Sequence, residues 1–202
     1  GTTLVLALIK NGQVHVAWCG DSRTYHYSTA NRERKNTYDL PNLRILTNDH
    51  SIVWPMVLAG KLDPNQAREH ELSHVITQSL GDPSNKPRPE SASFNIDVDD
   101  KILLCSDGLN SMLPDEYIQE ILSHNSPLDE VVTALIEGAN EKGGKDNISI
   151  ILAHVNSVPA LLSTNLLRPE AITAKSNLPL DQSKNYTRLN AYKSLELSLI
   201  HI

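Results

Sequence analysis

"ILLCSDGLNSM", residues 102–112, sets a run of apolar residues directly against Ser106, Asp107 and Gly108. Residues 102–105 have the composition of a buried strand. A carboxylate is costly to bury without a partner, so its position at the end of such a strand requires a reason. A strand end holds a side chain at a fixed point of a sheet, and a neighbouring glycine lets the backbone and a ligand come close. The stretch therefore indicates a sheet edge that presents Asp107 to a ligand.

The same local pattern occurs at two other aspartates. Asp21 in "AWCGDSR" and Asp146 in "GGKDNISII" also lie between an apolar strand and a turn of small residues. Hard divalent cations prefer carboxylate and water oxygens that are gathered from separate chain segments. The alternative for each aspartate alone is an ordinary turn residue that caps its own backbone. Together, the three aspartates favour a metal site over three unrelated turns.

Apolar periodicity predicts strands that are separated by short turns. The Asn11–Gly12 pair favours the tight turn of a first hairpin. We expect the first four strands to form an antiparallel meander and the next two to form a second hairpin. The expected strands are residues 3–9, 13–19, 23–28, 42–47, 93–100, 101–106 and 147–155.

Helical patterns occupy two parts of the chain. Residues 51–74 are irregularly helical, with Asp63 as an N-cap and Pro64 at the first helical position. Residues 113–125 and 126–144 predict two amphipathic helices. The apolar stripe of the second comprises Leu128, Val131, Val132, Leu135 and Ile136. Strands, then helices, then a returning strand favour a layered α+β sandwich over an alternating βαβ fold.

Composition narrows the class of protein. The 202 residues are 40% hydrophobic, which is enough for one sizeable domain and a tail. The formal net charge of −6 argues against nucleic acid as a partner. Cys19 and Cys105 are each the last residue of an apolar run, and we expect both to be buried, reduced thiols. With no apolar stretch near the roughly 20 residues that cross a bilayer, we expect no membrane segment and a cytoplasmic location.

Five motifs, taken in order, resemble a known family. They are "GTTLVLALI…VHVAWCGDSRTY", "LTNDHS", "ITQSLGD", "ILLCSDGLNSML" and "GGKDNISIILAHV". In order and spacing they are similar to the motifs of the metal-dependent serine/threonine protein phosphatases, the PPM or type 2C family, in its bacterial form. The resemblance covers residues 1–155.

The resemblance implies a fold and a reaction. The expected fold is a four-layer α-β-β-α sandwich of two antiparallel sheets flanked by helix pairs, incomplete at its N-terminus. The expected reaction is hydrolysis of phosphoserine or phosphothreonine in proteins by a metal-activated water, with two or three Mn²⁺ or Mg²⁺ ions. The implied partners are phosphorylated proteins, in opposition to a serine/threonine kinase.

Roles are carried over to the matching positions of this sequence. The resemblance implies that Asp107 and Asp146 are metal ligands of the dinuclear pair and that Asp21 belongs to an additional metal. Asn147 matches a positioning residue, and Gly108 gives room for the backbone.

The segment after "LTNDHS" implies a flap. Residues Ser51 to His74 match a flap beside the active site that contacts substrate, and Asp49 and His50 match a structural or substrate-adjacent role. The other histidines considered as ligands are expected to lie in the core, on the surface or in the flap region and to bind no metal; they are His15, His26, His70, His74 and His154.

The chain also departs from the family. An upstream metal-binding aspartate, an Asp-Gly-His segment and a phosphate-binding arginine have no counterpart here, so no catalytic residue is assigned. A non-catalytic pseudophosphatase that acts as a binding or regulatory module is the alternative function. Residues 156–202 are expected to be a linker or disordered tail. The last six, 197–202, "LSLIHI", match the in-frame translation of a sequencing adapter; the alternative is an ordinary amphipathic tail.

The missing motifs generate a prediction for the 202-residue chain alone. Because the upstream family motifs that supply half of the metal site have no counterpart in this chain, we expect it to have negligible phosphatase activity. The measurement is manganese-dependent phosphate release from a phosphothreonine peptide, and clear turnover by the isolated chain would contradict the expectation.

Overall fold

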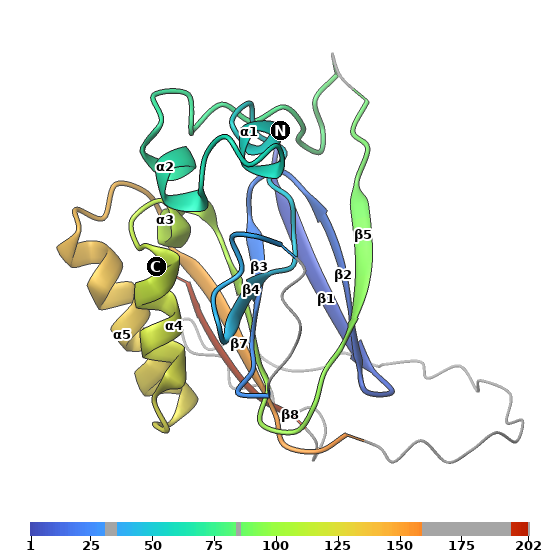
Figure 1. The fold of residues 1–202 in the computed structure, drawn as a ribbon, viewed down its shortest axis with the longest axis vertical. Helices are drawn as coiled ribbons and strands as arrows, with labels where there is room; N and C mark the ends of the chain where they lie inside the picture. The colour runs from blue at the N-terminus through green and yellow to red at the C-terminus, as the bar shows by residue number, and fades with distance from the viewer. Residues whose placement is uncertain (31–35, 84–85, 159–194, 202) are drawn as a thin grey trace, which may run out of the picture.

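Two antiparallel sheets form the centre of the molecule (Figure 1). The computed structural model describes residues 1–30, 36–83, 86–158 and 195–201. The three-stranded sheet has the order β1-β2-β5, formed by β1 (Leu4–Lys10), β2 (Gln13–Cys19) and β5 (Glu90–Asn95). The five-stranded sheet has the order β4-β3-β6-β7-β8. Its strands are β3 (Arg23–Tyr27), β4 (Leu43–Ile45), β6 (Lys101–Cys105), β7 (Ser149–Val155) and β8 (Leu195–His201).

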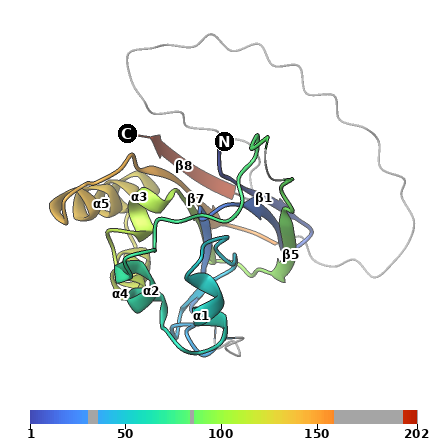
Figure 2. The same ribbon diagram turned by 90° about the horizontal axis from the view of Figure 1, so that it is seen from above.

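Helices lie on one outer face and at one end of the sandwich. They are α1 (Trp54–Leu58), α2 (Pro64–Glu69), α3 (Asp107–Asn110), α4 (Asp115–Ser123) and α5 (Leu128–Glu141). Seen from above, α3, α4 and α5 lie on the side of β7 that faces away from β1 and β5 (Figure 2). In the described ranges, no helix covers the outer face of the three-stranded sheet, where Leu4, Leu6 and Leu8 of β1 are about half exposed. None of the described helices combines the length and apolar character that crossing a membrane requires.

The two cores on either side of β6 explain why residues 102–105 form an uninterrupted apolar run. Leu103 and Cys105 point into the core between the five-stranded sheet and the helices. Ile102 and Leu104 point the other way, into the core between the two sheets. Because successive side chains of a strand alternate between faces, a strand that is covered on both faces must be apolar at every position.

Several local predictions are confirmed. Asn11 and Gly12 have positive φ angles of 51° and 73° and turn β1 into β2. Asp63 caps α2 through a complete capping box with Gln66, and Pro64 occupies its first turn. The predicted stripe of α5 is buried in the helix-side core.

Two predicted pairings are wrong. The expected four-strand meander is divided, because β1 pairs with β2 in one sheet and β3 pairs with β4 in the other. The expected second hairpin does not form either, since β5 pairs with β2 whereas β6 pairs with β3 and β7. Period-2 alternation predicts a strand and its buried face, but it does not specify which strand lies alongside.

The C-terminal segment also differs from the expected tail. Residues 195–201, predicted to be without regular structure, form strand β8 antiparallel to β7. Residues 156–158 have no regular structure. The remainder of the predicted tail, 159–194 and 202, lies outside the described residues.

Candidate functional site

The pairing of three neighbouring strands brings the predicted aspartates to one sheet edge. Arg23 at the start of β3 is opposite Cys105 at the end of β6, and Cys105 is opposite Ile150 near the start of β7. Asp21 lies just before β3, Asp107 just after β6, and Asp146 just before β7. Because the strands are antiparallel and in register, these three positions belong to the same edge.

The three carboxylates share one cavity. Asp21, Asp107 and Asp146 line a cavity of about 360 Å³ at this edge. Five further lining residues come from the predicted flap: Val53, Ala67, Arg68, Ser73 and His74. The remaining lining residues include Asp49, Asn110 and Lys145. The structure therefore brings together the three predicted ligands and the predicted flap.

The carboxylates repel one another. Burial raises the pKa of Asp21 to about 6, and the charges of Asp107 and Asp49 contribute further. Burial also raises the pKa of Asp107, with the charge of Asp146 as the next cause. A carboxylate whose pKa is raised by burial and by neighbouring anions is stabilised in the charged form by a cation placed beside it.

Gly108 allows the loop before β7 to pass close to Asp107. A Cβ atom on Gly108 would overlap the backbone carbonyl of Asn147. The same loop is held by Ser106, whose hydroxyl donates to the Asn147 carbonyl at 3.1 Å and accepts from the Ser149 amide at 3.0 Å. The Asn147 amide donates to Asp146 Oδ1 at 2.7 Å. The contacts of Asn147 are thus made by its backbone and help to fix the Asp146 carboxylate.

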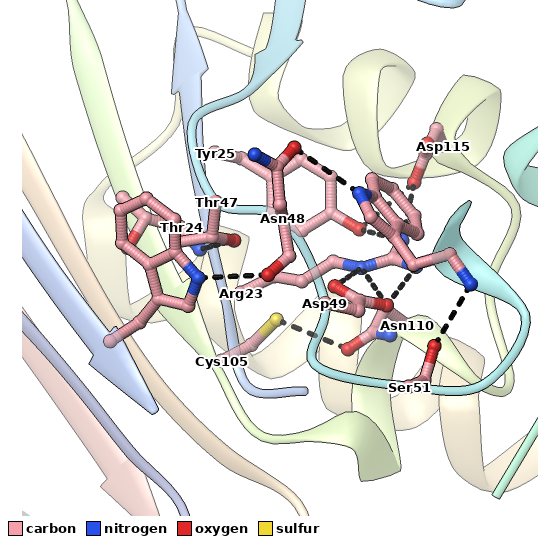
Figure 3. Close-up of polar contacts among 12 residues, drawn as sticks. Arg23, Thr24, Tyr25, Thr47, Asn48, Asp49, Ser51, Cys105, Asn110 and Asp115 are labelled. Carbon is pink, nitrogen blue, oxygen red and sulfur yellow. Dashed lines mark hydrogen bonds and ion pairs between the residues drawn. The ribbon is translucent and has the colours of Figure 1, made fainter. Parts of the chain in front are cut away.

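Arg23 and Asp49, which both line the cavity, form a buried ion pair (Figure 3). Arg23 donates from Nε to Asp49 Oδ1 at 2.9 Å and from Nη2 to Asp49 Oδ2 at 2.7 Å. Its Nη1 donates to the Tyr25 hydroxyl at 3.1 Å, and that hydroxyl donates to Asp115 Oδ1 at 2.9 Å. The guanidinium also lies over the ring of Trp54, 4.8 Å from its centroid. Arg23 therefore connects β3, the Asp49 segment, α1 and the start of α4.

The role of Arg23 was not predicted from the sequence. Its position in the "GDSR" motif was the only available signal, because Asp49 is distant in the sequence and shows no pattern that identifies its partner. Burial is the largest single effect and lowers the pKa of Arg23, but the charges of Asp49, Tyr25 and Asp115 and the hydrogen bonds to Asp49 together raise it well above the usual value. Asp49 is engaged in this ion pair, and His50 is buried beside it.

The other histidines occupy separate places. His26 is buried and pairs with Asp100 at 2.7 Å, and His15 bonds Ser93 on the neighbouring strand. His154 lies 3.6 Å from Asp99, and His70 accepts from the Leu72 amide. Of these predicted non-ligands, His74 is the one that lines the cavity.

The three carboxylates at the sheet edge have the chemistry that a divalent metal ion prefers. Asp21, Asp107 and Asp146 supply hard carboxylate oxygens, which suit Mg²⁺ or Mn²⁺. Within the described ranges, no three His, Cys, Asp or Glu side chains are close enough to surround a single ion. Each carboxylate would therefore hold an ion from one side, with water filling other positions, as Mg²⁺ commonly retains several waters.

Curated relatives of this chain are bacterial phosphatases. It is 35% identical over 156 residues to the serine/threonine phosphatase stp of Listeria welshimeri, an alignment that covers 77% of this chain and 57% of the relative. It is 35% identical over 161 residues to the protein phosphatase PhpP of Streptococcus pneumoniae, covering 79% and 60%. No protein-family model matches the chain.

Solved structures agree with these relatives. The catalytic domain of the serine/threonine protein phosphatase PstP, crystallised with two manganese ions, superposes with a TM-score of 0.61 at 28% identity, covering 77% of this chain and 58% of that one. In sequence and fold, the chain is thus similar to bacterial serine/threonine phosphatases, and its structural neighbours are PPM-type phosphatases. It spans less than two thirds of the length of the curated relatives named above.

The ion pair gives a stability prediction. Replacing Arg23 by leucine leaves Asp49 and Asp115 buried without their cation, so we expect a loss of about 3–5 kcal/mol in the free energy of unfolding. Arg23→Lys retains the charge but not the bidentate geometry. We therefore expect a smaller loss in the free energy of unfolding. The measurement is urea denaturation, with Arg88→Leu on the exposed surface as the control, expected to change stability by less than about 0.5 kcal/mol. Equal effects of Arg23→Leu and Arg88→Leu would contradict the assignment.

The close approach at Gly108 gives a second prediction. Gly108→Ala forces the Asn147 carbonyl outward, and overpacking of this kind costs about 1–3 kcal/mol. We also expect the NMR signals of Asp146 and Asn147 to shift, because the loop before β7 must move. Ser111→Ala, on the same side of the cavity without added volume, is the control. Unchanged stability and unchanged Asp146 signals in Gly108→Ala would show that the contact is not tight.

Proposed function

We propose that the protein containing this chain hydrolyses phosphoserine and phosphothreonine in other proteins, using divalent metal ions. The observation that carries the proposal is the convergence of Asp21, Asp107 and Asp146 on one cavity at the edge of the sheet. The similarity to bacterial serine/threonine phosphatases and to PPM-type structures supports the same reaction.

Mn²⁺ or Mg²⁺ is the proposed cofactor, with two or three ions in the intact site. PstP was crystallised with two manganese ions, which supports manganese as one suitable metal. Asp107 and Asp146 would hold the dinuclear pair, and Asp21 would hold an additional ion together with Asp107. When bound, such ions lower the pKa of a water nucleophile and neutralise charge on the phosphoryl oxygens.

The chain's own side chains supply a second part of the proposed chemistry. Arg68 Nη1 is buried and has no hydrogen-bond partner within the described structure, although Nη2 pairs with the exposed Glu69. Arg68 and Lys145 line the same cavity as the carboxylates. Guanidinium and ammonium groups bind phosphate oxygens, so these two side chains are suited to the anionic substrate and the carboxylates to the metal.

The proposed setting follows from the reaction. Phosphorylated proteins in the cytoplasm would be the substrates, and a serine/threonine kinase would be the opposing enzyme. The flap, residues 51–74, would contact the substrate beside the phosphoryl group, because five residues of this segment line the cavity.

Substitution of the proposed ligands provides the test. In the protein that contains this chain, Asp107→Asn and Asp146→Asn remove a negative oxygen donor, and we expect manganese-dependent hydrolysis of a phosphothreonine peptide to fall roughly 100-fold or more, since metal ions supply several kcal/mol to the transition state. Chelation with EDTA should abolish the activity, and Mn²⁺ should restore it. Asp129→Asn on the exposed side of α5 is the control.

Two outcomes would contradict the proposal. Activity that persists in EDTA would exclude the metal-dependent mechanism. Binding of Mn²⁺ and of the phosphopeptide without any phosphate release would favour the non-catalytic module instead.

A further inference from the structure

His50 is hydrogen-bonded to the turn that carries Asp21. The His50 amide donates to the Gly20 carbonyl at 2.9 Å, and the Gly20 amide donates to His50 Nδ1 at 3.1 Å. These two bonds run in opposite directions between the same two residues. The imidazole is buried, with 5% of the residue exposed, so water does not easily replace the Gly20 contact.

The Gly20 contact determines the state of the imidazole. A backbone N–H can only donate, so Nδ1 must present a lone pair and the ring hydrogen must be on Nε2. Nε2 faces Glu90 Oε1 at 3.3 Å, and this carboxylate accepts that hydrogen. The Glu90 contact and the Gly20 contact therefore favour the same neutral tautomer.

The Asp21 turn has little freedom on its other side. Gly20 has a φ of +112°, and a Cβ atom there would overlap the side chain of Thr3. Thr3 Oγ1 lies 3.0 Å from the hydroxyl of Ser22, the residue after Asp21. Thr3 and His50 thus hold the residues immediately before and after Asp21.

The far side of His50 is attached to the end of the flap. Its carbonyl accepts from the Thr77 amide at 2.7 Å, and the Ile52 amide donates to the Val75 carbonyl at 3.0 Å. These backbone bonds keep His50 in place independently of its side chain. Removal of the imidazole should therefore take one of the two hydrogen bonds from the Gly20 turn without detaching the flap.

We propose that His50 is a positioning residue, whose neutral Nδ1 acceptor holds the Gly20 turn so that the Asp21 carboxylate faces the cavity. The inference rests on the proposed metal site for its consequence, since a misplaced Asp21 would bind its ion weakly.

Three substitutions separate the Nδ1 acceptor from the bulk of the ring. In His50→Asn, the amide oxygen can occupy the place of Nδ1; His50→Gln reaches the place of Nε2 instead, and His50→Ala reaches neither. The 202-residue chain of each variant is titrated with Mn²⁺ alone, and paramagnetic broadening is followed at the carboxyl signals of Asp21 and Asp146. Amide hydrogen exchange at Gly20 and thermal unfolding are measured without metal.

We expect His50→Ala and His50→Gln to weaken Mn²⁺ binding at Asp21 by about 10-fold or more, the usual effect of losing a residue that orients a metal ligand. Binding at Asp146 should be unchanged. Gly20 exchange should accelerate in the same two variants, and His50→Asn should restore both properties. Glu90→Gln keeps an oxygen acceptor for Nε2–H and is expected to resemble the unmodified chain.

Two results would overturn the proposal. One is unchanged Gly20 exchange in His50→Ala or, if that variant does not fold, in His50→Gln. The other is that His50→Asn behaves like His50→Gln both in Mn²⁺ binding at Asp21 and in Gly20 exchange. If the unmodified chain shows no Mn²⁺ broadening at Asp21, the proposed metal site there fails, and Gly20 exchange alone decides whether His50 positions the turn.

Discussion

The site depends on the antiparallel register of β3, β6 and β7. With Arg23 opposite Cys105 and Cys105 opposite Ile150, the strand ends that carry Asp21, Asp107 and Asp146 meet at one edge. A register shift of one residue would turn every side chain of a strand to its other face. In β3 it would bring Thr24 and His26 into the core that Tyr25 and Tyr27 occupy. The alternation of β3 thus helps to hold the carboxylates in place by making an alternative register of that strand costly.

The ion pair of Arg23 with Asp49 connects this edge to the rest of the cavity. Buried charges are tolerated only with a well-placed partner, and here the cation has hydrogen-bonding or ring contacts on several sides. The partners come from different elements: Tyr25 from β3, Trp54 from the flap helix α1 and, through Tyr25, Asp115 from α4. Movement of any one of these elements would expose or unpair a charge. The network therefore holds the flap helix and α4 against the edge that carries the aspartates.

Local chemistry could be predicted where a few neighbouring residues decide the conformation. Asn11–Gly12 forms the first turn because both residues adopt positive φ, and Asp63 caps α2 because its side chain reaches the Gln66 amide. The stripe of α5 was also evident, because helical periodicity determines which face is buried. The division of the strands between two sheets was not predictable in this way. The partner of β2 is β5, which is far away in the sequence, and alternating residues fit either sheet.

For the candidate site, the sequence alone identified the three aspartates and the glycine beside Asp107, through a local signature of an acid and a small residue beside a strand. The flap, residues 51–74, was expected from the resemblance to the phosphatase family. Only the tertiary structure decided that Arg23 pairs with Asp49, that Asn147 acts through its backbone, and that His50 bonds Gly20. The physical reason is that a hydrogen bond or ion pair between distant segments depends on distance and direction in space. Residue type and spacing along the chain do not specify either one.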